Sequence, residues 1–195
     1  MTLLGLMALA FLIGSIPFGD IIARRKGVSL REVGSGNIGA TNVLRTIGKL
    51  PAILTLLGDV MKGTFAVAMA KSLLNDPSSE GIVGLSAVAG HNFSIFLRLK
   101  GGKGVATSIG VLLLYSPRVA LVTIALWVTV VYFTRYSSLG ALFAFAVLPL
   151  TMHVVDPVKA KVPIAVLMTL LLILKHADNI QRLIKGTESK LGEKI

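Results

Sequence analysis

The sequence predicts an all-α, polytopic integral membrane protein, most simply a single bundle of seven transmembrane helices. Of its 195 residues, 54% are hydrophobic and only 15% are charged. A soluble domain usually carries about 25% charged residues, so this chain has too few to coat a water-facing surface. Apolar stretches that approach the roughly 20 residues of a membrane span also recur along the chain. An ordinary water-soluble globule and a disordered chain are both excluded.

Seven apolar segments, separated by polar turns, supply the predicted spans. They are Leu3–Ile22, Pro51–Leu74, Ile82–Leu97, Gly104–Tyr115, Val119–Phe133, Leu139–Val155 and Val162–Leu174. The first segment lacks a basic start and a small-residue cleavage site, so we expect a retained span rather than a signal peptide. Without a repeat or a low-complexity tract, residues 1–195 are expected to form one membrane-embedded domain.

The stretches between the spans are predicted from their polar and glycine content. Val28–Gly48 is polar and Gly-rich, with too little apolar length to cross a membrane. Asn75–Glu80 is expected to be a turn, and Pro51 suits the first turn of the helix that it begins. The tail from Lys175 is polar and is expected to be helical at first.

The fourth segment is too short to cross as a full span. Twelve residues, Gly104–Tyr115, form a helix of about 18 Å at 1.5 Å per residue, against a hydrocarbon core of about 30 Å. Either the preceding loop dips into the membrane or the segment is a half-helix. Both place a helix N-terminus and Lys103 inside the protein. Five crossings with one re-entrant hairpin fit almost as well as seven.

The net charge of +11 is interpreted as a signal of orientation rather than of nucleic-acid binding. Most Lys and Arg residues fall in the loops of one side, which the positive-inside rule makes cytoplasmic. The N-terminus is then outside and the C-terminus cytoplasmic, and no nucleic-acid partner is predicted. Basic residues beside spans also attract anionic lipids and substrates. The absence of cysteine excludes disulfides, thiolate metal sites and a cysteine nucleophile.

The polar stretch Gly34–Thr46 has the residue types of an anion site. Its glycines allow backbone amides to turn toward a phosphate, as in anion-binding nests, and Arg45 can hold a phosphate through two hydrogen bonds. The candidate substrate-binding and donor residues here are Gly34, Ser35, Gly36, Asn37, Thr41 and Asn42. A flexible loop that caps a helix explains the glycines equally well, and the pattern alone leaves both interpretations open.

The run Gly101-Gly102-Lys103-Gly104 is more specific, because it precedes the short fourth segment. Broken helices whose N-termini face anions recur in membrane proteins. The alternative is a glycine turn with a lysine at the membrane interface. We favour an anion site formed by Lys103 and the three glycines.

Two further groups combine polar residues at helical spacing. His176 and Asn179 are three residues apart, so they share a helix face; spacing alone is equally typical of a solvated helix. Asp59 and Lys62 lie three apart within a predicted span, where charges are costly and are functional by default. We expect this pair to neutralise itself and to support the site structurally. His91 is expected to pack or to hydrogen-bond between helices.

Several signatures are absent. No His is followed five residues later by Asp, so the His-x4-Asp signature of acyl-CoA-dependent glycerol-phosphate acyltransferases is missing. There is no Gly-x-Ser-x-Gly elbow and no His/Asp/Glu cluster with metal-ligand spacing. Neither a metal site nor a cofactor is predicted.

Taken together and in order, the motifs resemble those of a known family. The matching runs are Gly34–Val43, Gly58–Gly63, Gly90–Phe93, Lys100–Thr107 and His176–Ile180. In these runs the chain is similar to the bacterial acyl-phosphate:glycerol-3-phosphate acyltransferases of the PlsY family. Ser94 stands where many relatives have proline.

The resemblance implies a reaction. An acyl group moves from acyl phosphate to the 1-position of sn-glycerol 3-phosphate, which gives lysophosphatidate and phosphate and begins phospholipid synthesis. Coenzyme A is not the donor, and a separate peripheral enzyme is expected to supply the acyl phosphate. The protein is then expected to be a monomer in the bacterial cytoplasmic (inner) membrane, with its active site on the cytoplasmic side.

Roles follow for the residues that match. The implied catalytic residues are Ser35, Arg45, Lys103, His176 and Asn179, with Asp59, Lys62 and His91 as structural support. Direct attack by the glycerol hydroxyl on the activated anhydride requires no metal or cysteine. The general base is either His176 or a substrate phosphate oxygen, and a covalent Ser35 intermediate would be a different mechanism. A transporter for phosphate-bearing solutes and a structural lipid-binding subunit are the competing interpretations.

Overall fold

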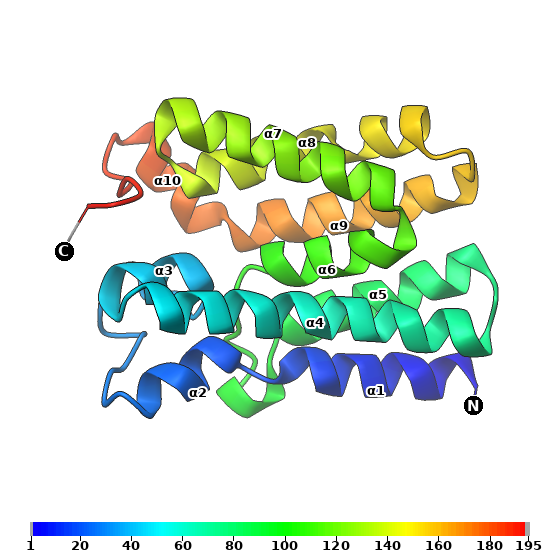
Figure 1. Ribbon diagram of the computed structural model, residues 1–195, viewed down its shortest axis with the longest axis horizontal. Coiled ribbons are helices and arrows are strands. Elements are labelled where there is room, and N and C mark those ends of the chain that lie inside the picture. Colours follow the sequence, from blue (N-terminus) through cyan, green and yellow to red (C-terminus); the bar gives the residue numbers. More distant parts are fainter. Residues whose placement is uncertain (1, 194–195) are drawn as a thin grey trace.

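The computed structural model describes residues 2–193, and these residues form helices and turns without a strand (Figure 1). The first predicted span is divided into α1, Leu3–Ser15, and α2, Phe18–Arg24. Pro17 lacks an N–H and its ring clashes with the preceding turn, so the helix is interrupted before it. Together the two helices still form a 22-residue apolar candidate span.

The break after α1 is stabilised by residues from distant parts of the chain. The Ser94 hydroxyl donates a hydrogen bond to the Ser15 carbonyl at 2.5 Å. The Lys62 ammonium donates to the Ile16 carbonyl at 3.0 Å. Backbone groups that leave a helix inside a membrane need such partners. Ser94, where many relatives of the resembled family have proline, therefore supplies a donor that proline lacks.

The next three helices depart from the predicted boundaries in specific ways. α3, Ala40–Thr46, is a short helix within the polar, Gly-rich stretch that we expected not to cross the membrane, and α4, Lys49–Leu73, begins two residues before Pro51. α5, Pro77–Asn92, occupies much of the expected turn, because the Asp76 side chain caps its start by accepting from the Ser79 amide at 2.8 Å. α5 also ends before the predicted Leu97, and a short 3₁₀ turn η1, Ile95–Leu97, follows.

The short fourth segment is a half-length helix, α6, Val105–Tyr115, with Gly104 at its N-cap. It begins part-way along α4, and the chain between α5 and α6 turns within the length of the bundle (Figure 1). α6 packs against α4, α5 and α7. The predicted half-helix is therefore present, and its N-terminus lies inside the protein.

The remaining helices are α7, Pro117–Thr134, α8, Ser137–Val155, η2, Lys159–Lys161, α9, Val162–Lys175, and α10, Ala177–Ile184. Of these, α7, α8 and α9 begin and end within two residues of the predicted spans, η2 lies in a predicted linker, and α10 forms the start of the tail, which we expected to be helical. α7 packs on α8 and α8 packs on α9, while α1 packs on α5. The chain bends by 60° between η2–α9 and α10. The main apolar core lies where α5, α6, α8 and α9 meet, around Tyr115, Phe145 and Met168.

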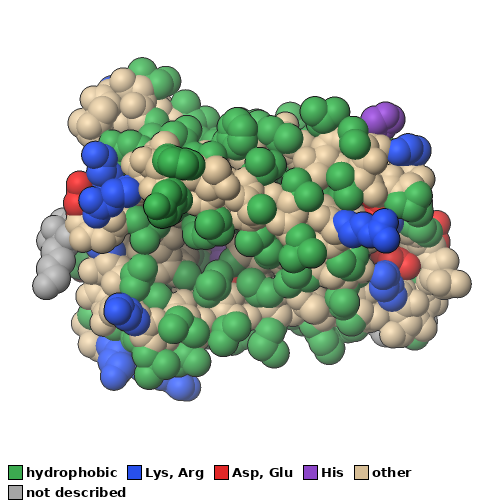
Figure 2. Space-filling model, turned by 45° about the horizontal axis from the view of Figure 1, so that its top comes forward, with side chains coloured by type: hydrophobic (Ala, Val, Ile, Leu, Met, Phe, Trp, Pro, Cys, Tyr) green, Lys and Arg blue, Asp and Glu red, His purple; other side chains and the backbone are tan. Residues whose placement is uncertain are grey.

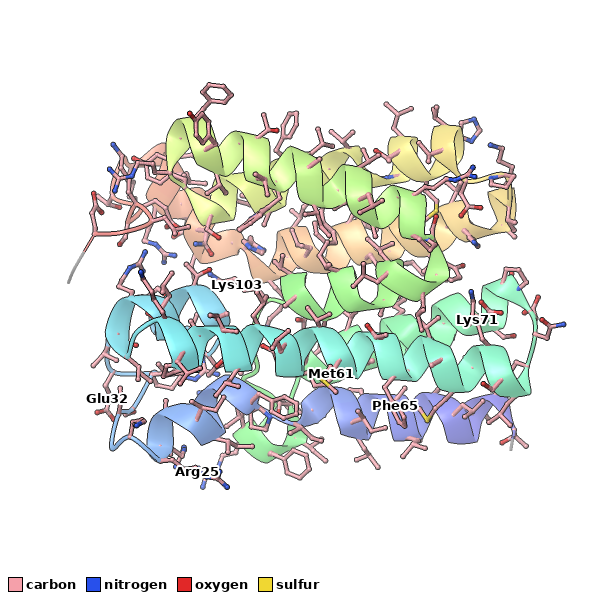
Figure 3. The ribbon with its side chains drawn as sticks, viewed as in Figure 1. Arg25, Glu32, Met61, Phe65, Lys71 and Lys103 are labelled. Atoms are coloured by element: carbon pink, nitrogen blue, oxygen red, sulfur yellow. The ribbon has the colours of Figure 1, made fainter. Side chains whose placement is uncertain are left out.

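The outer surface is that of a membrane protein. Lys and Arg side chains gather toward the two ends, and hydrophobic side chains cover the middle (Figure 2). On α4, Met61 and Phe65 point outward, 66% and 54% exposed (Figure 3). Among residues 2–193, four helices are long and apolar enough to cross a membrane, or five if the bent pair counts as one span. The two ends of the chain lie at opposite ends of the bundle, as either five or seven crossings requires (Figure 1).

Candidate functional site

Two adjoining cavities collect most of the residues that the sequence singled out. The larger has a volume of about 790 Å³ and the smaller about 270 Å³. Ser35, Asn37 and Lys103 line both cavities. The larger is also lined by Thr41, Asn42, Arg45, Asp59, His91, Gly104, His176 and Asn179, and the smaller by Gly36, Gly101 and Gly102. Gly34 and Lys62 line neither. The three separated polar stretches therefore meet at one place.

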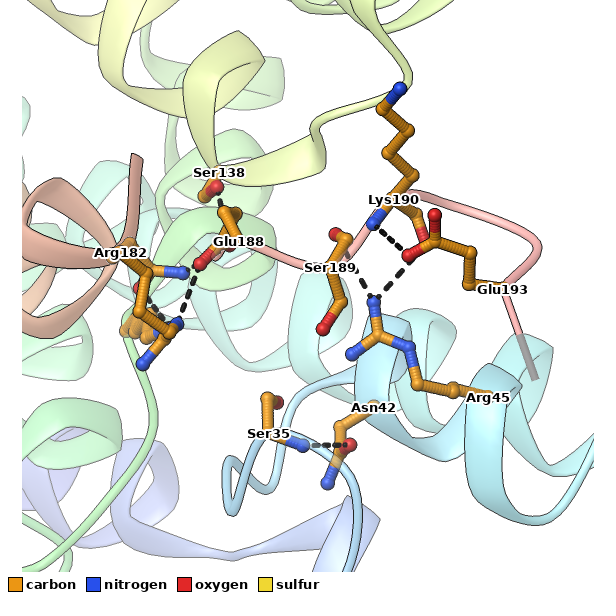
Figure 4. A network of polar contacts seen from close by, with 11 residues as sticks. Ser35, Asn42, Arg45, Ser138, Arg182, Glu188, Ser189, Lys190 and Glu193 are labelled. Atoms are coloured by element: carbon orange, nitrogen blue, oxygen red, sulfur yellow. Dashed lines mark hydrogen bonds and ion pairs between the residues drawn. The ribbon is translucent and has the colours of Figure 1, made fainter. Parts of the chain in front are cut away.

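The first stretch is shaped by the buried side chain of Asn42. Its amide nitrogen donates to the carbonyls of Leu30, Val33 and Asn37 at 3.3, 3.2 and 2.8 Å. Its oxygen accepts from the Ser35 amide at 2.9 Å (Figure 4). We predicted Asn42 as a substrate-binding residue; it lines the larger cavity, and these bonds show that its side chain also holds the loop in shape.

Gly34 is required by the same arrangement. Its φ of +61° favours glycine, and a Cβ would lie 2.2 Å from the Asn42 oxygen. Glycine at this position therefore lets the loop close over the Asn42 amide and present the Ser35 side chain to both cavities.

The loop Gly101–Gly104 lies on the last turn of α5. The Gly101 amide donates to the Asn92 carbonyl at 3.2 Å, and the Gly102 amide donates to the His91 carbonyl at 3.0 Å. We expected these amides to face an anion, so that part of the prediction needs correction. They satisfy the carbonyls at the end of α5 instead. What the loop presents to the cavities is the Lys103 side chain and the start of α6.

Lys103 occupies the centre of the site. It lies between the two halves of the bundle, just before α6 (Figure 3), and its ammonium donates to the Asn179 side-chain oxygen. Burial, assisted by the nearby Arg182 charge, lowers the pKa of Lys103 from its ordinary value to about 8. Because water solvates the Lys103 ammonium poorly, an anion that enters the cavity strongly stabilises this charged form.

His176 and Asn179 stand at the bend between α9 and α10 and are 2% and 3% exposed. His176 Nδ1 lies 2.9 Å from the Leu172 carbonyl. A carbonyl only accepts, so Nδ1 carries the proton and Nε2 is the unprotonated acceptor. The expected proximity of His176 to Asn179 is present, although His176 caps α10 rather than lying within it.

Glu188 is a site residue that the sequence analysis missed. It accepts hydrogen bonds from Asn179 at 2.6 Å, Ser138 at 2.6 Å and Arg182 at 2.7 Å (Figure 4). Burial alone would raise the pKa of Glu188, but these bonds and the Arg182 charge together hold it below its ordinary value. The sequence gives little signal for Glu188, because the tail carries two other acids, Asp178 and Glu193. Its partners become apparent only when the tail folds back onto α8.

Arg45 approaches the tail from α3. Its guanidinium donates to the Ser189 and Lys190 carbonyls at 3.5 and 3.4 Å (Figure 4). These are long bonds to neutral groups, so they do not neutralise the positive charge of Arg45. Arg45 therefore remains a cation on the wall of the larger cavity.

Asp59, Lys62 and His91 form a buried group behind the loop. Lys62 Nζ lies 2.8 Å from Asp59 Oδ1 and 2.9 Å from His91 Nδ1. Asp59 and His91 reach the larger cavity, whereas Lys62 does not. The predicted self-neutralising pair is present, and so is the predicted contact of His91 between helices.

The site is cationic at one end and apolar at the other. The smaller cavity is lined by one acid, Asp178, and by the cations Arg31, Lys100, Lys103, Lys175 and Arg182. The larger cavity continues between α4, α6 and α7 along Ile53, Leu56, Leu57, Val60, Ile109, Leu113, Ile124 and Trp127. Figure 2 shows the hollow in this face, bordered by hydrophobic side chains. Arg31 and Lys175 were not among the predicted site residues. The arrangement suits a ligand with an anionic head and an apolar tail.

Comparison with known proteins is consistent with this geometry. Residues 4–186 match the family described as glycerol-3-phosphate acyltransferase. Glycerol-3-phosphate acyltransferases of Sinorhizobium fredii and Geobacter sulfurreducens are 50% and 46% identical, over 96% and 95% of this chain and 92% and 95% of theirs.

Two solved structures have the same fold. Crystal structures of PlsY, an integral membrane glycerol 3-phosphate acyltransferase, match in a glycerol 3-phosphate form and a lysophosphatidic acid form. Their TM-scores are 0.92 and 0.90 at 40% and 39% identity. The matches cover 97% of this chain in both cases, and 96% and 95% of those chains.

The burial of Lys103 leads to a direct prediction. In protein whose lysines carry ¹³C-methyl labels, the Lys103 resonance should titrate with a midpoint near pH 8, against about 10.4 for an ordinary lysine. Lys103→Arg identifies the resonance by removing it. A midpoint at or above pH 10 would show that Lys103 is solvated and does not lie in the site.

Proposed function

The chain belongs to the glycerol-3-phosphate acyltransferase family, and from this membership we propose that it transfers an acyl group from acyl phosphate to the 1-position of sn-glycerol 3-phosphate. The products are lysophosphatidate and inorganic phosphate, the first acylation of phospholipid synthesis. Coenzyme A is not the donor. The observation that carries the proposal is the cationic cavity around Lys103 that opens into an apolar groove between α4, α6 and α7.

Both substrates carry phosphate, and the charges of the site suit two such groups. Lys103, Arg182 and Arg31 line the smaller cavity, and Arg45 lines the larger. A planar guanidinium pairs with phosphate through two parallel bonds, whereas a lysine acts as a point charge. The acyl chain lies in the apolar groove, where burial of each methylene contributes about 0.8 kcal/mol.

The reaction is a direct transfer. The C1 hydroxyl oxygen of glycerol 3-phosphate attacks the acyl carbonyl carbon, and the carbonyl–phosphate oxygen bond breaks as phosphate leaves. Ser35 and Asn37, which line both cavities, act as neutral donors toward the substrate oxygens. Lys103 stabilises the negative charge on the leaving phosphate, which is the kind of electrostatic contribution that dominates many enzymes. Holding both substrates in one cavity supplies further acceleration through proximity.

The hydroxyl proton needs an acceptor, and we assign it to an oxygen of the leaving phosphate. A phosphate with a second pKa near 6 is suited to this task. Protonated His176 would instead add a cation close to Lys103 and Arg182. Neutral His176, through its unprotonated Nε2, accepts a hydrogen bond from the glycerol and orients it, together with Asn179.

The chain acts as a monomer and as one domain over residues 1–195. The acyl phosphate is supplied by a separate peripheral enzyme.

We place the protein in the bacterial cytoplasmic (inner) membrane, crossing seven times, with the site and the C-terminus on the cytoplasmic side. The density of basic residues at the end that carries the site supports this orientation.

A reconstituted assay tests the function. Purified protein given an acyl phosphate and glycerol 3-phosphate should form 1-acyl lysophosphatidate and phosphate in equal amounts. Acyl-CoA in place of acyl phosphate should give no product. An equal rate with acyl-CoA, or acylation at the 2-position, would refute the donor and the regiochemistry respectively.

His176→Gln tests the assignment of the proton. A glutamine side chain keeps a neutral acceptor near the position of Nε2, so kcat should fall by less than about tenfold and its pH profile should keep its shape. General base catalysis typically contributes about 10²–10⁴-fold. A loss of that size in folded protein would make His176 the proton acceptor. His153→Gln is the matched control, since His153 lies outside both cavities.

Single cysteines test the orientation, because the chain has no native cysteine. Ser78 and Arg98 are both exposed, in the first turn of α5 and after its end respectively. With seven crossings, an impermeant thiol reagent labels Ser78→Cys in intact cells, and it labels Arg98→Cys only after the cytoplasmic side is opened. Labelling of Arg98→Cys from outside would instead indicate five crossings and a re-entrant α5–α6 hairpin.

A further inference from the structure

The buried Lys62 ammonium is surrounded by three atoms that carry lone pairs. An ammonium group carries three N–H donors and no acceptor. Three partners surround Nζ: the Ile16 carbonyl at 3.0 Å, Asp59 Oδ1 at 2.8 Å and His91 Nδ1 at 2.9 Å. Lys62 is 2% exposed, so water does not compete with these partners. Lys62 therefore donates hydrogen bonds to the Ile16 carbonyl and to His91 Nδ1. Its contact with Asp59 Oδ1 is an ion pair without hydrogen-bond geometry.

This arrangement determines the tautomer of His91. Because Lys62 donates to Nδ1, that nitrogen must present its lone pair, and the proton of the neutral ring lies on Nε2. Asp59 balances the charge of Lys62 and lies 3.5 Å from Nδ1, whereas Lys62 Nζ is closer to Nδ1, at 2.9 Å. His91 is thus a neutral imidazole with a fixed Nε2–H donor.

The Nε2–H group lies at the site. It is next to Gly102, where a Cβ would come within 2.3 Å of Nε2, so only glycine lets the loop lie against the ring. His91 lines the larger cavity together with Lys103. Among residues 2–193, hydrogen bonds to the ring are found at Nδ1 only. Nε2 is not one of the fully buried atoms that lack a partner, which are Asp59 Oδ1, both Asn92 amide atoms and the Thr107 hydroxyl. It therefore keeps accessible surface, and a ligand in the cavity can accept a hydrogen bond from it.

We propose that His91 is a catalytic residue that donates a hydrogen bond from Nε2 to the carbonyl oxygen of the acyl donor. This rests on the function proposed above. Asp59 and Val60 are consecutive on α4, and both line the cavity where its polar end passes into the apolar groove. An acyl chain in the groove must place its carbonyl at this junction. The donor then stabilises the negative charge that develops on that oxygen during attack.

His91 and His176 therefore have opposite roles. His176 donates from Nδ1 to a backbone carbonyl and presents an acceptor, whereas His91 accepts at Nδ1 from Lys62 and presents a donor. Asp59 and Lys62 are positioning residues in this scheme, because they set the tautomer of His91 without touching the substrate.

The tautomer can be read in the unmodified protein. The chain has three histidines, so a long-range ¹⁵N–¹H spectrum of ¹⁵N-histidine protein is assigned with His153→Gln and His176→Gln. His91 should show a protonated Nε2 and an unprotonated Nδ1, and Lys62→Met should abolish this fixed pattern. A protonated Nδ1 in the wild-type protein would overturn the proposal, whatever the variants do.

Kinetics test the contact with substrate. The glutamine amide reaches the Nε2 position and the asparagine amide only the Nδ1 position. His91→Asn should lower kcat roughly 100-fold, the size of effect seen when an oxyanion donor is removed. His91→Gln should recover at least tenfold of that loss, with the KM for glycerol 3-phosphate within twofold of wild type. Equal losses in the two variants, or a raised KM for glycerol 3-phosphate at unchanged kcat, would contradict the proposal.

Two control variants help to distinguish a wrong role for His91 from a wrong proposed function. Gly102→Ala should displace the ring and reduce kcat to a similar extent, and combining it with His91→Asn should add little further loss. His153→Gln should behave as wild type. Absence of lysophosphatidate from the wild-type protein would refute the proposed function itself. An active wild type with an equally active His91→Asn would refute only the role of His91.

Discussion

The site depends on one constraint: inside a membrane, backbone that leaves a helix must find partners for its N–H and C=O groups. Non-helical backbone is tolerated there only where it is buried in protein or lines a cavity. At the break after α1, Ser94 and Lys62 bind the carbonyls of Ser15 and Ile16. Between α5 and α6, the amides of Gly101 and Gly102 bind the carbonyls at the end of α5. These bonds allow the chain to turn within the bundle and to begin α6 there.

The turn between α5 and α6 leaves space inside the bundle for Lys103 and the two cavities. A full-length helix in place of α6 would fill the space that Lys103 and the cavities now occupy. Buried cations are costly unless they are paired, and the structure pairs some of them. Lys62 is neutralised by Asp59, and Arg182 is paired with Glu188. Within residues 2–193, Lys103 is in no ion pair, and its ammonium donates to the neutral Asn179 oxygen. The charge that remains available for an anionic ligand is therefore concentrated at Lys103 and its cavities.

Much of this site could be predicted from the sequence. The length of Gly104–Tyr115 indicated a half-helix, and the spacing of Asp59 and Lys62 indicated a buried pair. The hydrogen-bond partner of each amide group could not be predicted. A pattern of glycine and asparagine residues does not indicate whether an amide binds a ligand or another part of the chain. The amides of Gly101 and Gly102, and the side chain of Asn42, are used within the fold. Glu188 was missed because its partners on α8 and α10 become neighbours only through tertiary folding.

The central claim is that one cavity holds a phosphate-bearing head beside Lys103 while its acyl chain lies between α4 and α7. The most direct test is a structure of this protein with a non-hydrolysable acyl phosphonate. The account predicts the phosphonate oxygens within hydrogen-bonding distance of Lys103 and the alkyl chain along the groove residues of α4, including Leu56 and Val60. A phosphonate bound away from Lys103, or an alkyl chain outside the groove, would contradict it.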